Sequence, residues 1–229
     1  MFYDSTMLLL LPALLLALLA QGWMKSAYNK YSKIRTQAGI PASQAVQKIL
    51  YDNGNYEVSV IPTQGTLTDH YDPRKEVLSL SEGVYDSASV AALGIAAHEA
   101  GHAMQKKDGY AALSLRTLAV PAVNFGSALS MPIFILGLVM SWQPLLIAGI
   151  ALFALTVLFS LITLPVEFNA SRRAIQMLNA SGLITREEEA GVRKVLTAAA
   201  MTYVASAIGA LLQLFRLILL SKGASRRRN

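Results

Sequence analysis

Residues 96–105 read AAHEAGHAMQ, and this stretch holds two of the three histidines in the 229-residue chain. Serines that can cap a helix precede it, and apolar residues recur through it at helical spacing, so the sequence predicts a helix over about 89–105. On that helix His98 and His102 lie one turn apart on the same face. Both imidazoles can then reach one ion, since zinc–nitrogen bonds of about 2.0–2.1 Å fit this spacing.

Glu99 follows His98 directly and lies about 100° further around the helix. It is therefore expected beside the ion rather than bound to it, where it can accept a proton from water and later give it to a leaving amine. Together the three residues form the HExxH pattern of zinc hydrolases. The sequence predicts one Zn²⁺ and Glu99 as the catalytic base.

A catalytic zinc needs a third protein ligand and one open position. Glu167 is the preferred candidate, because it begins EFNASRRA directly after a long apolar block, and Pro165 could start a helix that presents it. Two histidines and this glutamate would make a His₂Glu site. His70, in LTDHYDP, is the alternative third ligand.

The rest of the chain is unusually apolar, with 54% hydrophobic and 15% charged residues. Long apolar blocks occupy 7–23, 118–142, 145–164 and 195–220, and the first three match the length needed to cross about 30 Å of hydrocarbon. We therefore expect a mainly α integral membrane protein with three or four transmembrane helices, a small cytoplasmic β-hairpin or sheet, and a zincin-like (gluzincin-like) HExxH helix. The fourth block either spans the membrane or packs beside the other helices, since polar residues interrupt it.

Basic residues follow the first apolar block and none precedes it, so the positive-inside rule places the polar regions in the cytoplasm. The expected parts are an N-terminal anchor (1–24), a cytoplasmic part with the HExxH helix (25–117), a transmembrane hairpin (118–165), a cytoplasmic helix with the third ligand (166–194), the fourth apolar helix (195–221) and a basic tail (222–229).

Within the first polar region, 41–53 has the periodicity of a helix, and 56–61 and 76–81 alternate like strands of a small antiparallel sheet. The strand at 76–81 could accept an extended substrate as an added strand. Cysteine is absent, which excludes disulfides and thiolate ligands. The net charge of +6 is better explained by anionic lipid next to cytoplasmic loops than by nucleic acid.

Three stretches resemble the membrane zinc metallopeptidases of the YugP family: SVAALGIAAHEAGHAMQ, PVEFNASRRA, and DHYDPRKEVLSLSEGVYDSASVAA. They are more distantly similar to the HtpX and CAAX-prenyl proteases. The resemblance covers about 68–174 and implies a multi-pass peptidase of the bacterial inner membrane, acting on membrane or misfolded proteins. It matches His98, His102 and Glu167 to the metal ligands and Glu99 to the base.

One position departs from the pattern of these enzymes, which commonly carry an aspartate four residues after the third ligand. Ser171 stands there and can still orient an imidazole without adding charge, and Asn169 or Asp69 could substitute. His70, Tyr203 and Arg172 are candidates for stabilising the oxyanion or binding substrate.

The predicted function is that of a zinc metalloendopeptidase at the cytoplasmic membrane surface. One alternative is a catalytically silent zinc-binding scaffold or chaperone subunit, which would have no use for Glu99. A transporter with an intramembrane histidine pair is the other, and it would need charged residues deep inside the spans.

Overall fold

The structure is a computed structural model that describes residues 5–226. It divides into two compact units, each assembled from segments that are distant in the sequence. We call them the apolar unit (5–20, 115–164 and 202–226) and the sheet unit (21–114 and 165–201). The last three residues of the predicted basic tail lie outside the described residues.

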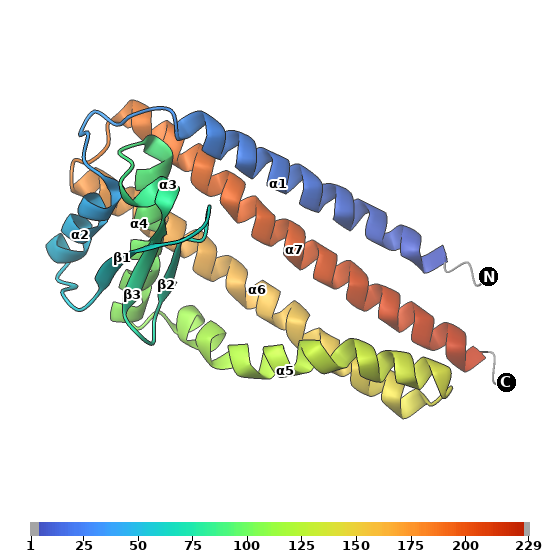
Figure 1. Ribbon diagram of the computed structural model, residues 1–229. Coiled ribbons are helices and arrows are strands. Elements are labelled where there is room, and N and C mark those ends of the chain that lie inside the picture. The colour runs from blue at the N-terminus through green and yellow to red at the C-terminus, as the bar shows by residue number, and fades with distance from the viewer. Residues whose placement is uncertain (1–4, 227–229) are drawn as a thin grey trace. The chain divides into compact units, whose positions relative to one another are not determined.

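Long helices account for the whole apolar unit (Figure 1). They are η1 (Ser5–Leu10), α1 (Leu11–Tyr31), α5 (Ala111–Val139), α6 (Gln143–Ala180) and α7 (Arg186–Arg226), of which α1, α5, α6 and α7 also contribute residues to the sheet unit. Within the described residues, four helices are long and apolar enough to cross a membrane, and the predicted fourth block belongs to one of them, α7.

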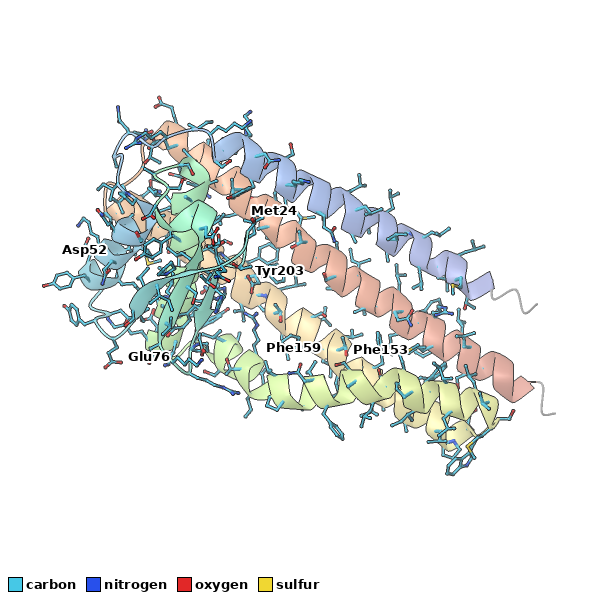
Figure 2. All side chains as sticks on the ribbon, in the orientation of Figure 1. Met24, Asp52, Glu76, Phe153, Phe159 and Tyr203 are labelled. Atoms are coloured by element: carbon cyan, nitrogen blue, oxygen red, sulfur yellow. The ribbon has the colours of Figure 1, made fainter. Side chains whose placement is uncertain are left out.

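Exposed apolar side chains explain why these helices need an apolar surrounding, and Figure 2 shows side chains projecting outward along them. Along the first helix more than half of the surface of each of six leucines is exposed: Leu8, Leu11, Leu14, Leu15, Leu18 and Leu19. In water this exposure would forgo the free energy of burying apolar surface, about 25 cal/mol per Å². In hydrocarbon it costs nothing, and the intrahelical hydrogen bonds satisfy the backbone.

Close packing joins α5 to α6 in the predicted hairpin. A Cβ atom on Gly149 would lie 2.7 Å from the Cβ of Phe134, and one on Gly137 would lie 2.8 Å from the backbone nitrogen of Leu146. Small residues at such points let two helices approach closely within a membrane. α6 then continues without a break through Pro165. The expectation of a new helix at Pro165 was therefore wrong, and Glu167 lies on the same helix as the third apolar block.

The sheet unit contains a three-stranded sheet in the order β1-β3-β2, formed by β1 (Ser59–Thr63), β2 (His70–Asp72) and β3 (Val77–Ser81). β1 pairs with β3 in parallel, with Ser59 opposite Val77. β2 pairs with β3 antiparallel, with Tyr71 opposite Leu78. The sequence missed β2 and wrongly predicted that its two strands would pair antiparallel. They run in the same direction because the chain first passes through β2 and then returns between the two edge strands.

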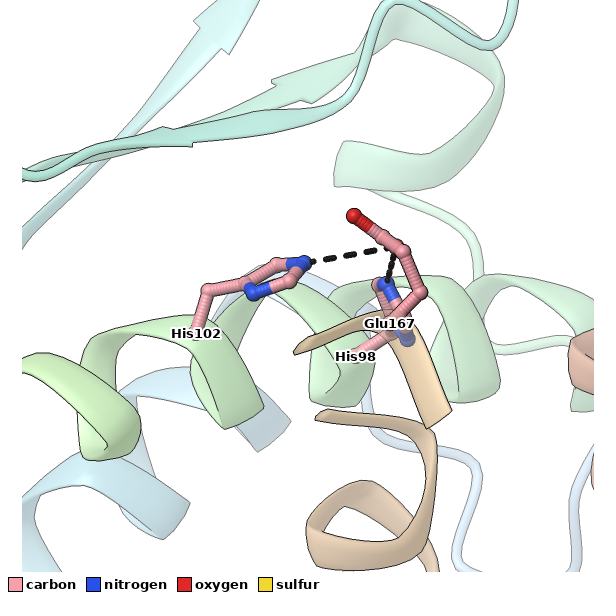
Figure 3. Close-up of side chains that lie close together, drawn as sticks. All are labelled: His98, His102 and Glu167. Atoms are coloured by element: carbon pink, nitrogen blue, oxygen red, sulfur yellow. Dashed lines mark hydrogen bonds and ion pairs between the residues drawn. The ribbon is translucent and has the colours of Figure 1, made fainter. Parts of the chain in front are cut away.

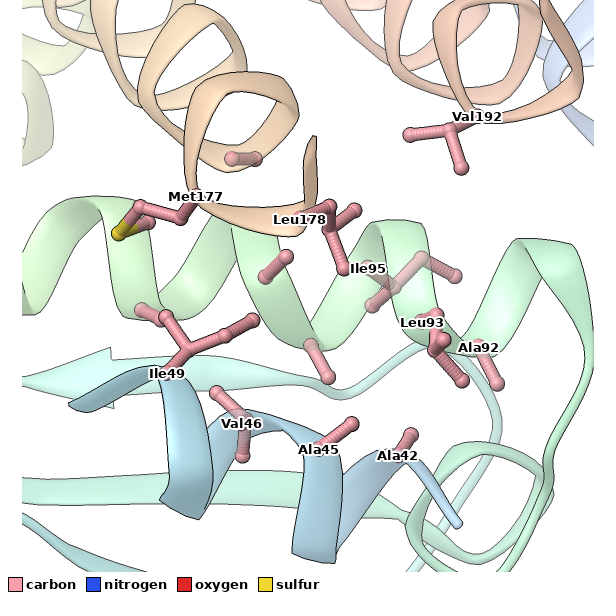
Figure 4. Packing of buried hydrophobic residues seen from close by; sticks show 14 of the residues in the cluster. Ala42, Ala45, Val46, Ile49, Ala92, Leu93, Ile95, Met177, Leu178 and Val192 are labelled. Atoms are coloured by element: carbon pink, nitrogen blue, oxygen red, sulfur yellow. The ribbon is translucent and has the colours of Figure 1, made fainter. Parts of the chain in front are cut away.

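The apolar core of this unit is formed largely by helical segments. α2 (Ala42–Asp52), which confirms the helix predicted at 41–53, buries Val46 and Ile49 against α4 (Val90–Lys107) (Figure 4). The short α3 (Glu82–Tyr85) precedes α4, and the end of α6 and the start of α7 contribute Leu178 and Val192. Full burial of each such side chain contributes about 1.5–3 kcal/mol.

The helix α4 is central to the unit, with almost all of its length buried. Its N-terminus is capped by Ser89, whose Oγ accepts a hydrogen bond from the Ala92 nitrogen at 3.2 Å, which confirms the predicted start of the HExxH helix. A helix that is buried along most of its length presents its side chains at fixed positions, which is what a metal site requires.

Candidate metal centre

His98 and His102 project from α4 toward one carboxylate on α6 (Figure 3). The Nε2 atom of His98 lies 3.2 Å from Oε2 of Glu167, and the Nε2 atom of His102 lies 3.7 Å from the same oxygen. The imidazole rings are almost perpendicular, with centroids 4.8 Å apart. One potential ligand atom from each residue lies within 4.8 Å of the other two, so the three residues could hold a metal ion.

Glu167 is buried, which distinguishes this group of three side chains from a chance grouping of exposed residues. The residue is 2% exposed, and a buried carboxylate is costly unless charge or hydrogen bonds compensate it. His102 is also buried, and burial alone would lower its pKa, but the carboxylates of Glu167 and Glu99 raise it above its ordinary value. Two imidazole nitrogens and one carboxylate oxygen are a donor set that zinc accepts. The residues present therefore fit a zinc ion.

The two helices approach each other at Gly101, between the two histidines. A Cβ atom there would lie 2.6 Å from the carbonyl oxygen of Ala170, on the turn of α6 that follows Glu167. Only a residue without a side chain permits this separation, so the glycine brings the carboxylate within reach of the imidazoles.

Each histidine is also held by a hydrogen bond at its second ring nitrogen. Nδ1 of His98 lies 3.1 Å from Oγ of Ser171, and Nδ1 of His102 lies 3.0 Å from Oε1 of Gln105. Ser171, a candidate for orienting a histidine, is therefore in contact with His98. Gln105 was not predicted, although it closes the quoted stretch AAHEAGHAMQ.

Gln105 determines which nitrogen of His102 carries the proton. Its amide nitrogen donates to the carbonyl oxygen of Val166 at 2.8 Å and to Oδ1 of Asn169 at 2.9 Å. Because a backbone carbonyl can only accept, the amide orientation is fixed and its oxygen must face Nδ1 of His102. That nitrogen donates, which leaves the lone pair of Nε2 for a metal.

Asn169 therefore acts one step further from the histidines than predicted. Its Oδ1 accepts from Gln105 and, at 2.9 Å, from Nε of Arg173, which also forms an ion pair with Asp108 at the end of α4. The chain of contacts ties α6 to α4 along the side of the site.

Glu99 is half-buried next to His98 on α4. Among the residues that the structure describes, its carboxylate has no hydrogen bond or ion pair. A carboxylate beside the donor set on the same helix is in a position to take part in proton transfer.

The remaining predicted site residues are not members of this three-residue cluster. His70 is exposed on β2, with Nδ1 2.9 Å from the carbonyl oxygen of Thr68, and it is not one of the three clustered residues. Asp69 accepts hydrogen bonds from the backbone nitrogen of Ser81 at 2.8 Å and from its hydroxyl, so its carboxylate is bonded to the end of β3. Arg172 is exposed on α6, and Tyr203 belongs to the apolar unit.

The strand at 76–81 also differs from its predicted use. β3 is the central strand, with β1 on one side and β2 on the other, so it has no free edge to which a substrate could be added. The strand edges belong to β1 and β2 instead.

Comparison with known proteins assigns the chain to a family. Residues 6–222 match the model of a family described as "Putative neutral zinc metallopeptidase". The chain belongs to this family. It is 46% identical over 212 residues to the protein named "Putative membrane protease YugP" from Bacillus subtilis (strain 168), covering 93% of this chain and 94% of that protein. No solved structure matches the chain.

Membership of this family confirms the resemblance to YugP-type membrane zinc metallopeptidases seen in the sequence. With four apolar helices and a membrane protease as a relative, the chain is a membrane protein of a zinc peptidase family, and a protease function follows in general terms. The family also implies zinc as the metal for the group formed by His98, His102 and Glu167.

Proposed function

We propose that the protein is a zinc metalloendopeptidase that hydrolyses peptide bonds of membrane or misfolded proteins at the cytoplasmic surface of a bacterial inner membrane. One zinc ion is bound by His98, His102 and Glu167. The observation that carries the proposal is the convergence of these three donors around one point, with the carboxylate of Glu99 next to the two histidines on the same helix.

The chemistry divides between the metal and the chain. When bound, zinc supplies a Lewis acid that polarises the scissile carbonyl and acidifies water. Glu99 accepts one proton from the attacking water as the water oxygen bonds to the carbonyl carbon. It then delivers that proton to the amide nitrogen while the carbon–nitrogen bond breaks, so the amine leaves neutral and the carboxylate is regenerated. Ser171 and Gln105 keep the imidazoles oriented throughout.

The orientation in the membrane rests on charge. Lys25, Lys30, Lys33 and Arg35 follow the first apolar block, and the turn between α5 and α6 has no charged residue, which supports cytoplasmic positions for 25–117 and 166–194 around the hairpin 118–165. The anchor at 1–24, the fourth helix at 195–221 and the tail at 222–229 complete the proposed organisation. His70, Arg172 and Tyr203 remain proposed contributors to substrate or oxyanion binding.

Zinc analysis and proteolysis of the purified protein test the proposal together. The protein in detergent should contain about one zinc per chain, by the three-ligand rule for catalytic sites, and should cleave an unfolded substrate such as casein. The double variant His98→Ala/His102→Ala should lose both properties. Zinc content without cleavage by any preparation would favour a silent scaffold instead, and full zinc content in the double variant would refute the site.

A further inference from the structure

A pocket of about 360 Å³ lies between α6 and the beginning of α7, entirely within the sheet unit. Its lining combines cationic, hydroxyl and apolar side chains, among them Phe168, Ser171, Arg172, Arg193, Leu196 and Thr197. None of the lining residues is acidic. This mixture suits a molecule that is anionic at one end and apolar at the other.

Two guanidinium groups give the pocket its charge. Arg172 is exposed and has no hydrogen bond or ion pair with any residue that the structure describes. Arg193 donates through Nε to Glu189 at 2.6 Å, one helical turn away, but its own side chain is 59% exposed, so the pair holds it only weakly. The terminal nitrogens of both arginines are therefore available, and guanidinium groups bind phosphate in a bidentate manner.

The pocket also lies where two helices leave their apolar segments. The apolar block of α6 ends at Leu164, and that of α7 begins at Val195. At 1.5 Å per residue, Phe168 and Arg172 lie about 6–12 Å beyond the end of the block. Phe168 therefore lies at the depth of the lipid headgroups, since they and the interface add about 5–8 Å on each side of the hydrocarbon. Arg172 lies about one helical turn further from the hydrocarbon. Basic pockets between transmembrane helices are known to bind anionic headgroups.

We propose that this pocket binds the headgroup phosphate of an anionic phospholipid, with Arg172 and Arg193 on the phosphate and the acyl chains next to the apolar lining. The proposal goes beyond peptide hydrolysis and does not depend on it. The pocket shares Ser171 with the candidate metal centre, where the same hydroxyl contacts His98.

The test measures lipid binding directly. The full-length protein is delipidated in detergent and titrated with short-chain phosphatidylglycerol or phosphatidylcholine, and binding is followed by native mass spectrometry. Wild type should prefer phosphatidylglycerol. Arg172→Gln should bind it about fivefold more weakly, the contribution of one basic residue near an anionic headgroup. Arg193→Gln should act in the same direction.

Lys194→Gln is the matched control, because it removes the same charge next to Arg193 but at a residue that does not line the pocket. It should bind like wild type. Equal affinity of wild type and both arginine variants would overturn the proposal. If glycerol phosphate or an acidic peptide displaces the lipid at equal concentration, the site recognises a soluble anion and the lipid assignment is wrong. Unchanged melting temperatures without lipid would show that the variants fold.

Discussion

A methyl group on Gly101 would lie 2.6 Å from the carbonyl oxygen of Ala170. Contacts of this length do not occur in folded proteins, so any larger residue at position 101 must push α4 and α6 apart. Gly101 directly precedes His102, and Ala170 lies between Glu167 and Ser171 in the chain. One interhelical contact thus sets the distance from the histidines to the carboxylate.

Gly101→Ala should therefore lower zinc affinity and proteolysis together. Alanine is favoured over glycine inside a helix by about 0.5–1 kcal/mol, so helix propensity alone would stabilise the variant. The expected loss of zinc affinity and proteolysis must therefore come from the displacement of α4 and α6. Zinc content after dialysis against a weak chelator measures it.

Gly22→Ala adds the same methyl group to α1, where no atom lies within 4 Å of the new carbon. This control should keep wild-type zinc content. If Gly101→Ala also keeps it, the contact with Ala170 does not set the geometry of the site.

Glu99 is proposed as the base and Glu167 as a metal ligand. Replacing each with glutamine should therefore affect zinc content and hydrolysis differently. Glu99→Gln should keep zinc and lose about 10²–10⁴-fold in hydrolysis, because an amide cannot accept the proton. Glu167→Gln should lose metal affinity first, and excess zinc should restore part of the activity. Metal content and casein cleavage are measured on the same preparations.

Glu82→Gln, an exposed change at the start of α3, is the control and should alter neither quantity. A Glu167→Gln protein with wild-type zinc and activity would remove Glu167 from the ligand set, and His70 would then have to be tested in the same way.

Gln105→Met should weaken zinc binding about 10- to 100-fold, as is typical when the partner of a metal-bound histidine is removed. The thioether fills similar space but cannot hold the proton on Nδ1 of His102. A competition titration with a chromophoric chelator gives the affinity. The matched change Gln47→Met, on the exposed face of α2, should leave it unchanged. Equal affinities in both variants would show that Gln105 only fills space.

The predictable part of the site is the part that local geometry determines. His98, Glu99 and His102 share one helix, so helical periodicity alone arranges them. Glu167 could be predicted because the hairpin between the two motifs returns the chain, and a glutamate directly after an apolar block is conspicuous. The long apolar blocks also need no tertiary information to be recognised.

Long-range contacts determine the rest. Gln105 binds Val166 and Asn169, 61 and 64 residues away, and nothing in its neighbourhood distinguishes it from a surface glutamine. β2 has only three residues, too few to show an alternating pattern, and its absence from the prediction also reversed the inferred pairing of the other strands. Tertiary packing, rather than local preference, decides such features.

The last prediction concerns the side of the membrane on which the site lies. Since the chain has no cysteine, a single introduced thiol can be labelled without background. Ala111→Cys and Ala180→Cys place exposed thiols in the two regions proposed as cytoplasmic, and Met140→Cys places one in the uncharged turn between α5 and α6. In intact cells an impermeant maleimide should label only the thiol at position 140, because positive loops stay inside. After permeabilisation all three should react. Labelling at position 111 or 180 in intact cells, with position 140 protected, would invert the proposed topology and place the zinc site outside the cytoplasm.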